Sequence, residues 1–446
     1  MNKLTDPFWL RFLPAALRSR VSGRPGLHAI LHNSGWLVLE KCVRLVLGLL
    51  VGAWMARYLG PIQYGELAYA LVFIAFFQVV ASLGLDGIVV RELALSQEKA
   101  GGILGTAFQL RLMTGIVCWA VAVAGMGLLN GWQHSSTWIT ALAGASLVFQ
   151  ATDTIDLWFQ SQSQSRRTVI AKLGAYIISN GIKIILIKAE APLLAFAFVI
   201  ALDIVLAAGG LIIAYKYFPC DGPWHRVSAL GQKLLKESWP FIVSGLSIMV
   251  YMRIDQIMIR ELLGQRELGI YAAVLPFASL WQFIPMTLSV SIAPFLIRKR
   301  QESETEYMRA LAGIFRIFSA LGWMVCLFIL AMSSFIVDVL LGQEYREGSK
   351  ILSIYVFTNL FIGLGVAQGL WLLNEGKSLI SLFNALLGAI ACLIGNFLLI
   401  PSLGLKGAAI TAVLAQMVAA MLSNLILSPK MFALQVRGLI LLGYKG

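Results

Sequence analysis

Apolar stretches long enough to cross a lipid bilayer dominate this sequence. Charged residues make up only 13% of the chain, about half of the roughly 25% found in soluble domains. A helix needs about 20 mostly apolar residues to cross a hydrocarbon core of ~30 Å. Twelve such stretches recur, at about 34–56, 67–90, 103–129, 138–160, 168–187, 192–215, 239–260, 270–297, 310–336, 351–373, 378–400 and 407–428. The sequence therefore predicts an all-α polytopic membrane protein with twelve transmembrane helices.

The placement of basic residues predicts the orientation of these helices. With the amino terminus inside, 21 of the 35 Lys and Arg residues fall in cytoplasmic segments, 7 in outer loops and 7 within the spans. Positive residues accumulate on the cytoplasmic side of membrane proteins. We therefore expect both termini in the cytoplasm. The net charge of +13 is explained by this topology and gives no reason to predict nucleic-acid binding.

A ten-residue pattern occurs twice, each time after the first span of a half. Residues 59–68 read LGPIQYGELA and residues 263–272 read LGQRELGIYA, which both fit L-G-x-x-x-[YL]-G-x-x-A. The spacing of 204 residues covers six spans, so the two halves have the same orientation. Parallel six-helix repeats commonly place a substrate site between them near the membrane midplane. With 41 glycines in the chain, a chance match is the alternative.

These features predict two lobes joined by a linker. The expected segments are a basic, amphipathic cytoplasmic amino terminus (1–33), a first six-helix lobe (34–215), a cytoplasmic linker with an amphipathic helix (216–238), a second six-helix lobe (239–428) and a cytoplasmic tail (429–446). Basic amphipathic helices of this kind lie on the inner leaflet.

Four motifs in register carry a family resemblance. They are MARYLGPIQYG (55–65), YMRIDQIMIRELLGQRELGIYAAV (251–274), LGQEYREGSKIL (341–352) and NFLLIPSLGLKGAAIT (396–411). The chain resembles, over nearly its whole length, the Wzx-type polysaccharide repeat-unit flippases. These belong to the multidrug/oligosaccharidyl-lipid/polysaccharide exporter superfamily.

The resemblance implies a V-shaped bundle of two six-helix lobes that opens alternately to each side of the bacterial inner membrane. The implied cargo is an undecaprenyl-pyrophosphate-linked oligosaccharide, moved from the cytoplasmic to the outer leaflet for O-antigen or exopolysaccharide synthesis. A cationic lumen and coupling to a proton or sodium gradient are also implied. The implied partners are membrane lipid, a polysaccharide polymerase and a chain-length co-polymerase.

Charged residues within spans are the candidate site residues, because a charge in the bilayer core usually faces a protein interior or a water-filled path. Arginine suits a pyrophosphate, since its planar guanidinium donates to two oxygens and stays protonated. The candidate substrate-binding cations are Arg44, Arg111, Lys172, Lys183 and Arg253. Arg44 also lies four residues after Glu40, so the alternative is an ion pair on one helix face. Snorkelling toward the surface is the alternative for Arg111, Lys172 and Lys183.

The candidate groups for ion coupling or gating are the acids Asp153, Asp156, Asp203 and Asp255. Asp153 and Asp156 share a helix face and can form a proton-binding site, although water at the nearby span end offers a plainer explanation. Asp203 lies nearest the bilayer centre, so we expect a cation from the third or fifth span as its partner.

Arg253 and Asp255 raise a separate question, since both lie in one apolar run, SIMVYMRIDQIMI (247–259). Two residues on a helix are about 200° apart, so the two side chains address different neighbours. We expect one of them to face the space between the lobes and the other to hold its span within its own lobe. A purely structural polar network is the alternative.

Several classes of protein are disfavoured. NEGKS (374–378) resembles the end of a phosphate-binding loop, but Trp371 occupies the place of the required first glycine. The four histidines are scattered, so we predict no metal site and no cofactor. The alternatives to a flippase are a multidrug or small-solute cation antiporter of the same superfamily and a membrane enzyme such as a polymerase or glycosyltransferase. The short predicted outer loops disfavour the enzyme.

Overall fold

The computed structural model describes residues 25–442, which are helical almost throughout and contain no strand. The first half comprises α2 (Pro25–Ser82), α3 (Asp86–Leu95), η2 (Gln97–Lys99), α4 (Ala100–Asn130), α5 (Ser135–Gly144), α6 (Ser146–Phe149), η3 (Gln150–Thr152), α7 (Asp153–Ser161), α8 (Ser165–Lys188) and α9 (Leu193–Tyr217). The second half comprises α10 (Ser228–Leu262), α11 (Gln265–Ser279), η4 (Leu280–Gln282), α12 (Phe283–Glu302), α13 (Glu304–Ile336), η5 (Val337–Leu341), η6 (Gln343–Tyr345), α14 (Gly348–Tyr355), α15 (Thr358–Glu375), α16 (Ser378–Leu403), α17 (Leu405–Met417), η7 (Val418–Leu422), α18 (Asn424–Leu427) and α19 (Pro429–Leu439).

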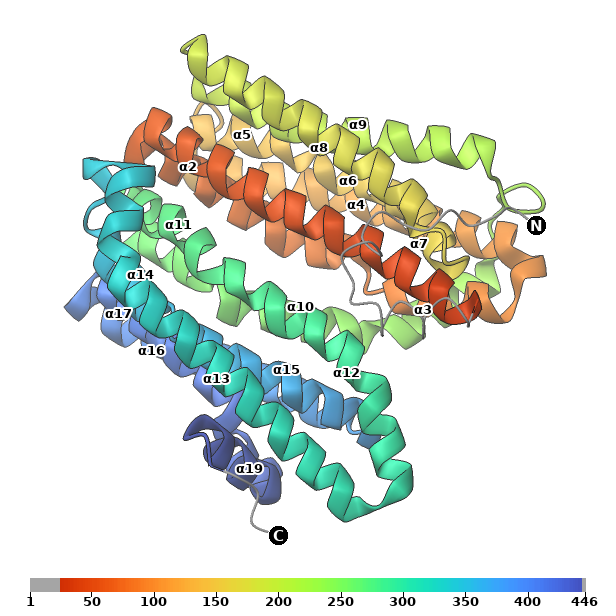
Figure 1. Ribbon diagram of the computed structural model, residues 1–446. Coiled ribbons are helices and arrows are strands. Elements are labelled where there is room, and N and C mark those ends of the chain that lie inside the picture. The colour runs from red at the N-terminus through yellow and green to blue at the C-terminus, as the bar shows by residue number, and fades with distance from the viewer. Residues whose placement is uncertain (1–24, 443–446) are drawn as a thin grey trace.

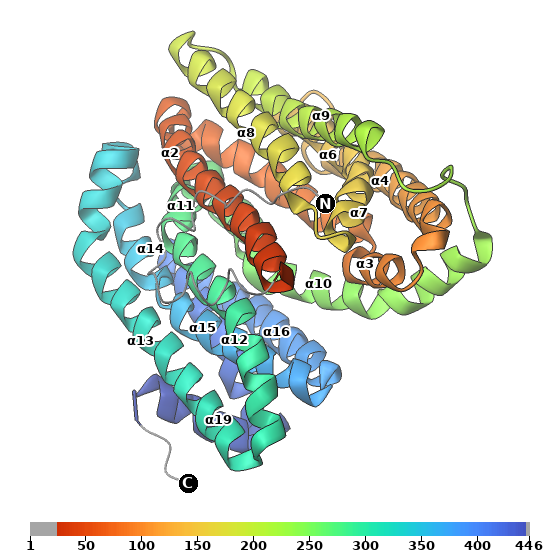
Figure 2. The ribbon, with the colours of Figure 1, turned by 45° about the vertical axis from the view of Figure 1, so that its right-hand side comes forward.

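The helices form a V of two lobes. Figure 1 shows α2 to α9 grouped in one layer and α11 to α17 in the other, with α10 running between them. The lobes converge where the two L-G-x-x-x-[YL]-G-x-x-A motifs lie, which we call the motif end. They diverge toward the connection between α9 and α10, which we call the linker end, and Figure 2 shows the same divergence from another side. At the linker end, α12 and α13 pack mainly within their own lobe.

Ten helices among the described residues are long and apolar enough to cross a membrane. The difference from the predicted twelve has two causes. One helical stretch, Gly35–Leu95, contains two predicted spans, because the chain continues helically on both sides of a break at Gly60. The predicted span 138–160 is interrupted where α6, η3 and α7 follow one another, so no single long helix covers it.

The outer surface of the lobes is apolar. On α4, Met113, Val117 and Val121 are more than half exposed, and on α13 Met324 and Leu327 are similarly exposed. A protein surface in water rarely carries such contiguous apolar area, whereas lipid tails solvate it without cost. Together with the ten apolar helices, this surface marks a multi-pass membrane protein.

The repeated motif has the same backbone conformation in both lobes. Gly60 has a φ of 69° and the equivalent Gly264 has a φ of 116°. Glycine adopts this region readily because it has no Cβ. Each of these glycines turns the chain from one span into the next. The two motifs are therefore matching turns of a parallel repeat.

The two motifs also pack against each other reciprocally. A methyl group at Gly65 would lie 1.9 Å from the carbonyl oxygen of Gln265, and one at Gly269 would lie 1.8 Å from the carbonyl oxygen of Pro61. Gly65 and Gly269 are equivalent positions of the repeat, as are Pro61 and Gln265. Small residues allow helix backbones to approach this closely in membranes. We call this contact between α2 and α11 the glycine seam.

Polar contacts between the lobes surround the glycine seam. Tyr345 donates a hydrogen bond through Oη to the carbonyl oxygen of Ala56, at 2.6 Å. Tyr69 donates through Oη to Oε1 of Glu261, at 3.2 Å. The guanidinium of Arg260 lies 4.7 Å from the centre of the Tyr69 ring. The motif end is therefore closed by packed backbone and by side chains of both lobes.

The predicted linker helix lies at the start of a longer helix. Instead of a separate surface helix, residues from Ser228 onward continue into the span as α10, with Pro240 inside the helix. Leu234, in the first part of α10, is buried in the first lobe against Leu83 and Leu85. The last part of α10 packs with the second lobe, so one continuous helix connects the two.

Helices lie near both ends of the described residues. The predicted amphipathic amino terminus lies mostly outside the described residues, and α2 is helical from Pro25. The expected carboxyl-terminal tail instead contains α19, which packs on α13: Trp323 donates through Nε1 to the carbonyl oxygen of Leu439, at 3.0 Å.

We predict that Gly65→Ala and Gly269→Ala each destabilise the folded protein by about 1–3 kcal/mol, the usual cost of forcing a methyl group into a packed contact. Thermal unfolding of the detergent-purified protein measures this. Gly52→Ala is the control, because Gly52 lies in α2 with open space around it, so alanine there should be neutral or slightly stabilising. Equal melting temperatures for Gly65→Ala and Gly52→Ala would contradict the close packing of the glycine seam.

Candidate functional site

A cavity of about 500 Å³ lies between the lobes, next to the glycine seam. Helices α2, α10 and α11 form its walls. Its lining is Met55, Tyr64, Leu67, Ala68, Leu71, Val72, Ala75, Gln78, Met249, Arg253, Gln256, Ala272, Leu275, Pro276 and Ser279. Arg253 is the one charged residue in this lining. We call this space the inter-lobe cavity.

Arg253 and Asp255 have different surroundings. Arg253 is exposed on the cavity wall and has no carboxylate within ion-pair distance among residues 25–442. Asp255 is only 1% exposed. It accepts a hydrogen bond from Oη of Tyr271 at 2.5 Å and another from the backbone N–H of Gln256 at 2.8 Å. Arg253 thus faces the space between the lobes, while Asp255 ties α10 to α11 of its own lobe.

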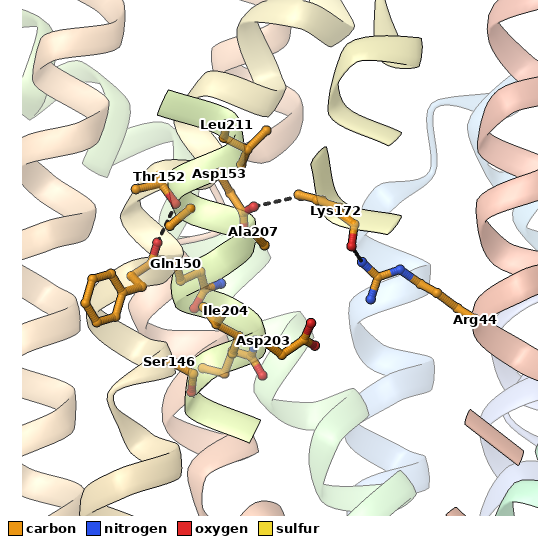
Figure 3. Close-up of a pocket in the computed structure, with 13 residues that line it drawn as sticks. Arg44, Ser146, Gln150, Thr152, Asp153, Lys172, Asp203, Ile204, Ala207 and Leu211 are labelled. Carbon is orange, nitrogen blue, oxygen red and sulfur yellow. Dashed lines mark hydrogen bonds and ion pairs between the residues drawn. The ribbon is translucent and has the colours of Figure 1, made fainter. Parts of the chain in front are cut away.

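A second, smaller cavity of about 180 Å³ lies within the first lobe (Figure 3). Its lining is Arg44, Gln78, Ser146, Phe149, Gln150, Thr152, Asp153, Lys172, Asp203, Ile204, Ala207, Ala208 and Leu211. These residues come from α2, α6, η3, α7, α8 and α9. Gln78 lines both cavities, so the two spaces adjoin. We call the second space the first-lobe pocket.

Acidic groups compensate the two cations of the first-lobe pocket. Nζ of Lys172 lies 2.7 Å from Asp153 and 2.8 Å from Asp156, so this lysine separates the two carboxylates. Nε of Arg44 lies 2.9 Å from Oε1 of Glu40, the pair that their four-residue spacing predicts. Charge that is already paired is less available to bind an anion.

Arg44 is further fixed by two neighbours on α8. It donates through Nη2 to the carbonyl oxygen of Lys172 at 3.2 Å, a contact drawn in Figure 3. Its guanidinium also lies 4.6 Å from the centre of the Tyr176 ring. A cation over an aromatic face gains about 0.5–2 kcal/mol. Arg44 therefore joins α2 to α8.

Asp203 lines the pocket from α9. Figure 3 shows its carboxylate turned toward the space between α9 and the helix that carries Arg44. Its Oδ1 atom is buried, and the hydroxyl of Ser179 on α8 is the donor beside this carboxylate. Lys183 on α8 and Arg44 are its cationic neighbours, within electrostatic range. Lys183 lies in the fifth predicted span and Arg44 in the first, and neither forms an ion pair with Asp203 within 4.0 Å among the described residues.

Arg111 lies away from both cavities. Its side chain is 2% exposed, and Nη2 lies 2.5 Å from Oδ1 of Asp86 on α3. The pair joins α4 to α3. Because Asp86 is 25 residues away in the sequence, this partner does not follow from helical spacing.

Sequence reasoning missed the uncharged polar lining of the first-lobe pocket. Ser146, Gln150 and Thr152 lie where the predicted span 138–160 is broken. A signal was present in the sequence, because the run QATDT (150–154) is polar within an otherwise apolar stretch. A 3₁₀ stretch inside a longer helical run, such as η3, often marks a functional position. Gln78 was also missed, as one amide within a long apolar span.

Comparison with known proteins identifies related chains. Residues 30–298 match the family described as "Polysaccharide biosynthesis protein". The capsular polysaccharide biosynthesis protein CapF of Staphylococcus aureus is 28% identical over 167 residues, which are 37% of this chain and 42% of CapF. The match therefore spans less than half the length of that relative.

Solved structures share the fold. An inward-facing multidrug resistance MATE family transporter of the MOP superfamily superposes with a TM-score of 0.72 and 14% identity, covering 88% of this chain and 95% of the other. The lipid II flippase MurJ, in an inward closed conformation, gives a TM-score of 0.68 and 14% identity, covering 92% and 91%. A MOP superfamily transporter from Pyrococcus furiosus superposes with a TM-score of 0.61 and 16% sequence identity, covering 92% of this chain and 96% of the other. The fold is that of MOP superfamily transporters.

We predict that Lys172→Met destabilises the protein by about 1–3 kcal/mol, because it leaves Asp153 and Asp156 facing each other without their cation. Chemical or thermal unfolding in detergent measures the loss. Adding Asp153→Asn and Asp156→Asn to Lys172→Met should recover most of it. Lys188→Met, at the exposed end of α8, is the matched control. If the triple variant is no more stable than Lys172→Met alone, the ion pairs are not the cause.

Proposed function

The chain belongs to the polysaccharide biosynthesis protein family, and from this premise we propose that it is a lipid-linked oligosaccharide flippase. It moves an undecaprenyl-pyrophosphate-linked oligosaccharide repeat unit from the cytoplasmic to the outer leaflet of a bacterial inner membrane. The product serves the synthesis of a surface polysaccharide, such as O-antigen or an exopolysaccharide. The similarities to a capsular polysaccharide biosynthesis protein and to the fold of a lipid II flippase support this role.

The observation that carries the proposal is the charge of Arg253 in the inter-lobe cavity, which has no ion-pair partner within 4.0 Å among the described residues. Most of the lining is apolar, and the carboxylate that interacts with this guanidinium at longer range, Asp255, is buried and bonded to Tyr271. A pyrophosphate brings the missing negative charge, and its oxygens accept paired hydrogen bonds from arginine. An interaction of this kind is stronger in a poorly hydrated cavity than in water. Arg253 is therefore the proposed anchor of the pyrophosphate.

The arrangement of the lobes supports alternating access. The glycine seam closes the motif end, and the lobes diverge at the linker end. With both termini in the cytoplasm, as the basic residues indicate, the divergent end faces the cytoplasm, where lipid-linked repeat units would enter. Release on the other side requires the glycine seam to separate. The seam and its surrounding polar contacts are then the outer gate.

Asp255 is the proposed coupling residue. Its partner Tyr271 belongs to the second copy of the repeated motif, two residues after Gly269 of the glycine seam. A proton or sodium ion that binds Asp255 alters its hydrogen bond with Tyr271, and so alters the helix that forms half of the seam. This gives ion binding a short physical route to the outer gate through a packed element.

We predict that Arg253→Ala lowers the rate of translocation by about tenfold or more, because a hydrogen bond to a charged group contributes about 1.5–3 kcal/mol. The assay measures the outer-leaflet accessibility of an undecaprenyl-pyrophosphate oligosaccharide in proteoliposomes. Arg266→Ala, which removes an exposed arginine at the motif end, should be neutral. Arg253→Lys should restore only part of the rate, because lysine lacks the paired geometry.

Two outcomes of this assay would oppose the proposal. Unchanged translocation by Arg253→Ala would remove Arg253 as the anchor. Failure of the unmodified protein to move any lipid-linked sugar, together with gradient-driven export of a small cationic solute, would instead indicate an antiporter.

We predict that Asp255→Asn makes translocation insensitive to an imposed pH or sodium gradient, while the protein stays folded in the membrane. Asparagine keeps an acceptor for Tyr271 but carries no charge to bind an ion. The same proteoliposomes, with and without each gradient, provide the measurement, and Asp338→Asn at an exposed position is the control. Retained gradient sensitivity would place coupling elsewhere, and loss of folded protein would indicate a structural role for Asp255.

A further inference from the structure

We propose that the first-lobe pocket binds uncharged sugar residues of the cargo, so that the glycan and the pyrophosphate occupy separate sites. This inference rests on the proposed flippase function and assigns a ligand class to a pocket that the pyrophosphate does not fill. Three features of the pocket support it: its charge, its unused hydrogen-bond acceptors and its position at a break in the transmembrane helix.

The charge of the pocket disfavours an anion. Three cations, Arg44, Lys172 and Lys183, lie in or beside it, against the four carboxylates Glu40, Asp153, Asp156 and Asp203. The two lining cations are already paired at 2.7–2.9 Å. A phosphate or an acidic sugar placed here would meet an excess of negative charge. The pyrophosphate therefore belongs at Arg253, and the pocket suits a neutral ligand.

The unused polar atoms of the pocket are acceptors. Oε1 of Gln150 is buried without a hydrogen-bond partner among the described residues, and Oδ1 of Asp203 is buried with the hydroxyl of Ser179 as its nearest donor. Buried polar atoms are normally paired, and an unpaired one calls for a ligand or water. A fully ionised phosphate has no hydrogen to donate, whereas sugar hydroxyls and N-acetyl amides do. A glycan therefore carries the donors that these acceptors can use.

Comparison of the two lobes separates the polar residues that both lobes use from those found in the first lobe alone. The break between α6 and α7 at 150–152 has a counterpart in the second lobe, where α14 ends at Tyr355 and α15 begins at Thr358. With the repeat spacing of 204, Gln150, Thr152 and Asp153 correspond to Ile354, Val356 and Phe357. In both lobes a threonine donates to a backbone carbonyl at this place: Thr152 to Phe149 at 2.7 Å and Thr358 to Tyr355 at 2.8 Å. Gln150 and Asp153, by contrast, have apolar counterparts in the second lobe, so they are additions to the architecture.

The pocket is placed to act together with the inter-lobe cavity. Gln78 contributes to the walls of both spaces, so one extended molecule can reach from Arg253 into the pocket. Phe149, which is 38% exposed, offers an apolar ring surface at the pocket, suited to the C–H face of a sugar. The pyrophosphate and the glycan are adjacent parts of one cargo, which matches two adjoining sites.

The test compares the binding of two lipids to the purified full-length protein in nanodiscs. One is undecaprenyl pyrophosphate, and the other is the same lipid bearing a neutral disaccharide of N-acetylhexosamine and hexose. We expect the unmodified protein to bind the glycosylated lipid about tenfold more tightly. Gln150→Ala should abolish this gain without changing affinity for the bare lipid. Arg253→Gln should weaken both lipids by the same factor, and Gln133→Ala, in the exposed turn before α5, should change neither.

The outcomes separate the two proposals. The proposal of a glycan site in the first-lobe pocket would be wrong if the unmodified protein bound both lipids equally. It would also be wrong if Gln150→Ala still bound the glycosylated lipid as much more tightly as the unmodified protein does. Neither result would contradict the flippase function. Binding of neither lipid would overturn the flippase itself.

A second test changes the charge of the pocket and does not depend on whether Gln150→Ala folds. Asp203→Asn should increase affinity for a lipid whose disaccharide ends in a uronic acid by about tenfold, because it removes a carboxylate that repels the acidic sugar. Unchanged or weaker binding of the acidic lipid by a folded Asp203→Asn would contradict the proposed role of the pocket charge.

Discussion

The reciprocal packing of Gly65 and Gly269 is the contact on which the arrangement of the lobes depends. Each glycine lies so close to a backbone carbonyl of the other lobe that the methyl group of an alanine would not fit between them. The contact brings α2 and α11 together at the motif end, and the inter-lobe cavity forms beside it with both helices as walls. Membrane helices gain little from hydrophobic association, so close backbone packing between small residues is the means available. The two copies of the motif are therefore equivalent positions of the repeat and also the contact that holds the two lobes together.

The two cavities differ in their charge, and this difference connects the structure with the proposed cargo. Arg253 forms no ion pair within 4.0 Å among the described residues, whereas Lys172 and Arg44 are paired with carboxylates. A lipid-linked glycan is itself divided into an anionic pyrophosphate and a polar sugar chain. The account assigns the anion to Arg253 and the sugar to the acceptor-rich pocket, with Gln78 at their junction.

The sequence predicted local features well and long-range contacts poorly. Span positions follow from hydrophobicity, and the Glu40–Arg44 pair follows from helical spacing. That the two motifs touch, or that Lys172 lies between Asp153 and Asp156, depends on how separate helices are placed, which no local pattern reports. The break at 150–152 was missed because the surrounding apolar residues outweigh a short polar run. The linker helix and the span from 239 were predicted as separate segments because their hydrophobicity differs, whereas α10 runs through both as one helix.

Distances between the lobes test the central claim most directly, namely that the glycine seam opens as the linker end closes. Spin labels can replace exposed glutamines in a background without native cysteines: Gln97 with Gln301 at the linker end, and Gln133 with Gln343 at the motif end. Pulsed electron spin resonance then measures both pairs with and without an undecaprenyl-pyrophosphate oligosaccharide under an ion gradient. The account predicts a shorter linker-end distance together with a longer motif-end distance. Two unchanged distances, or two that change in the same direction, would contradict it.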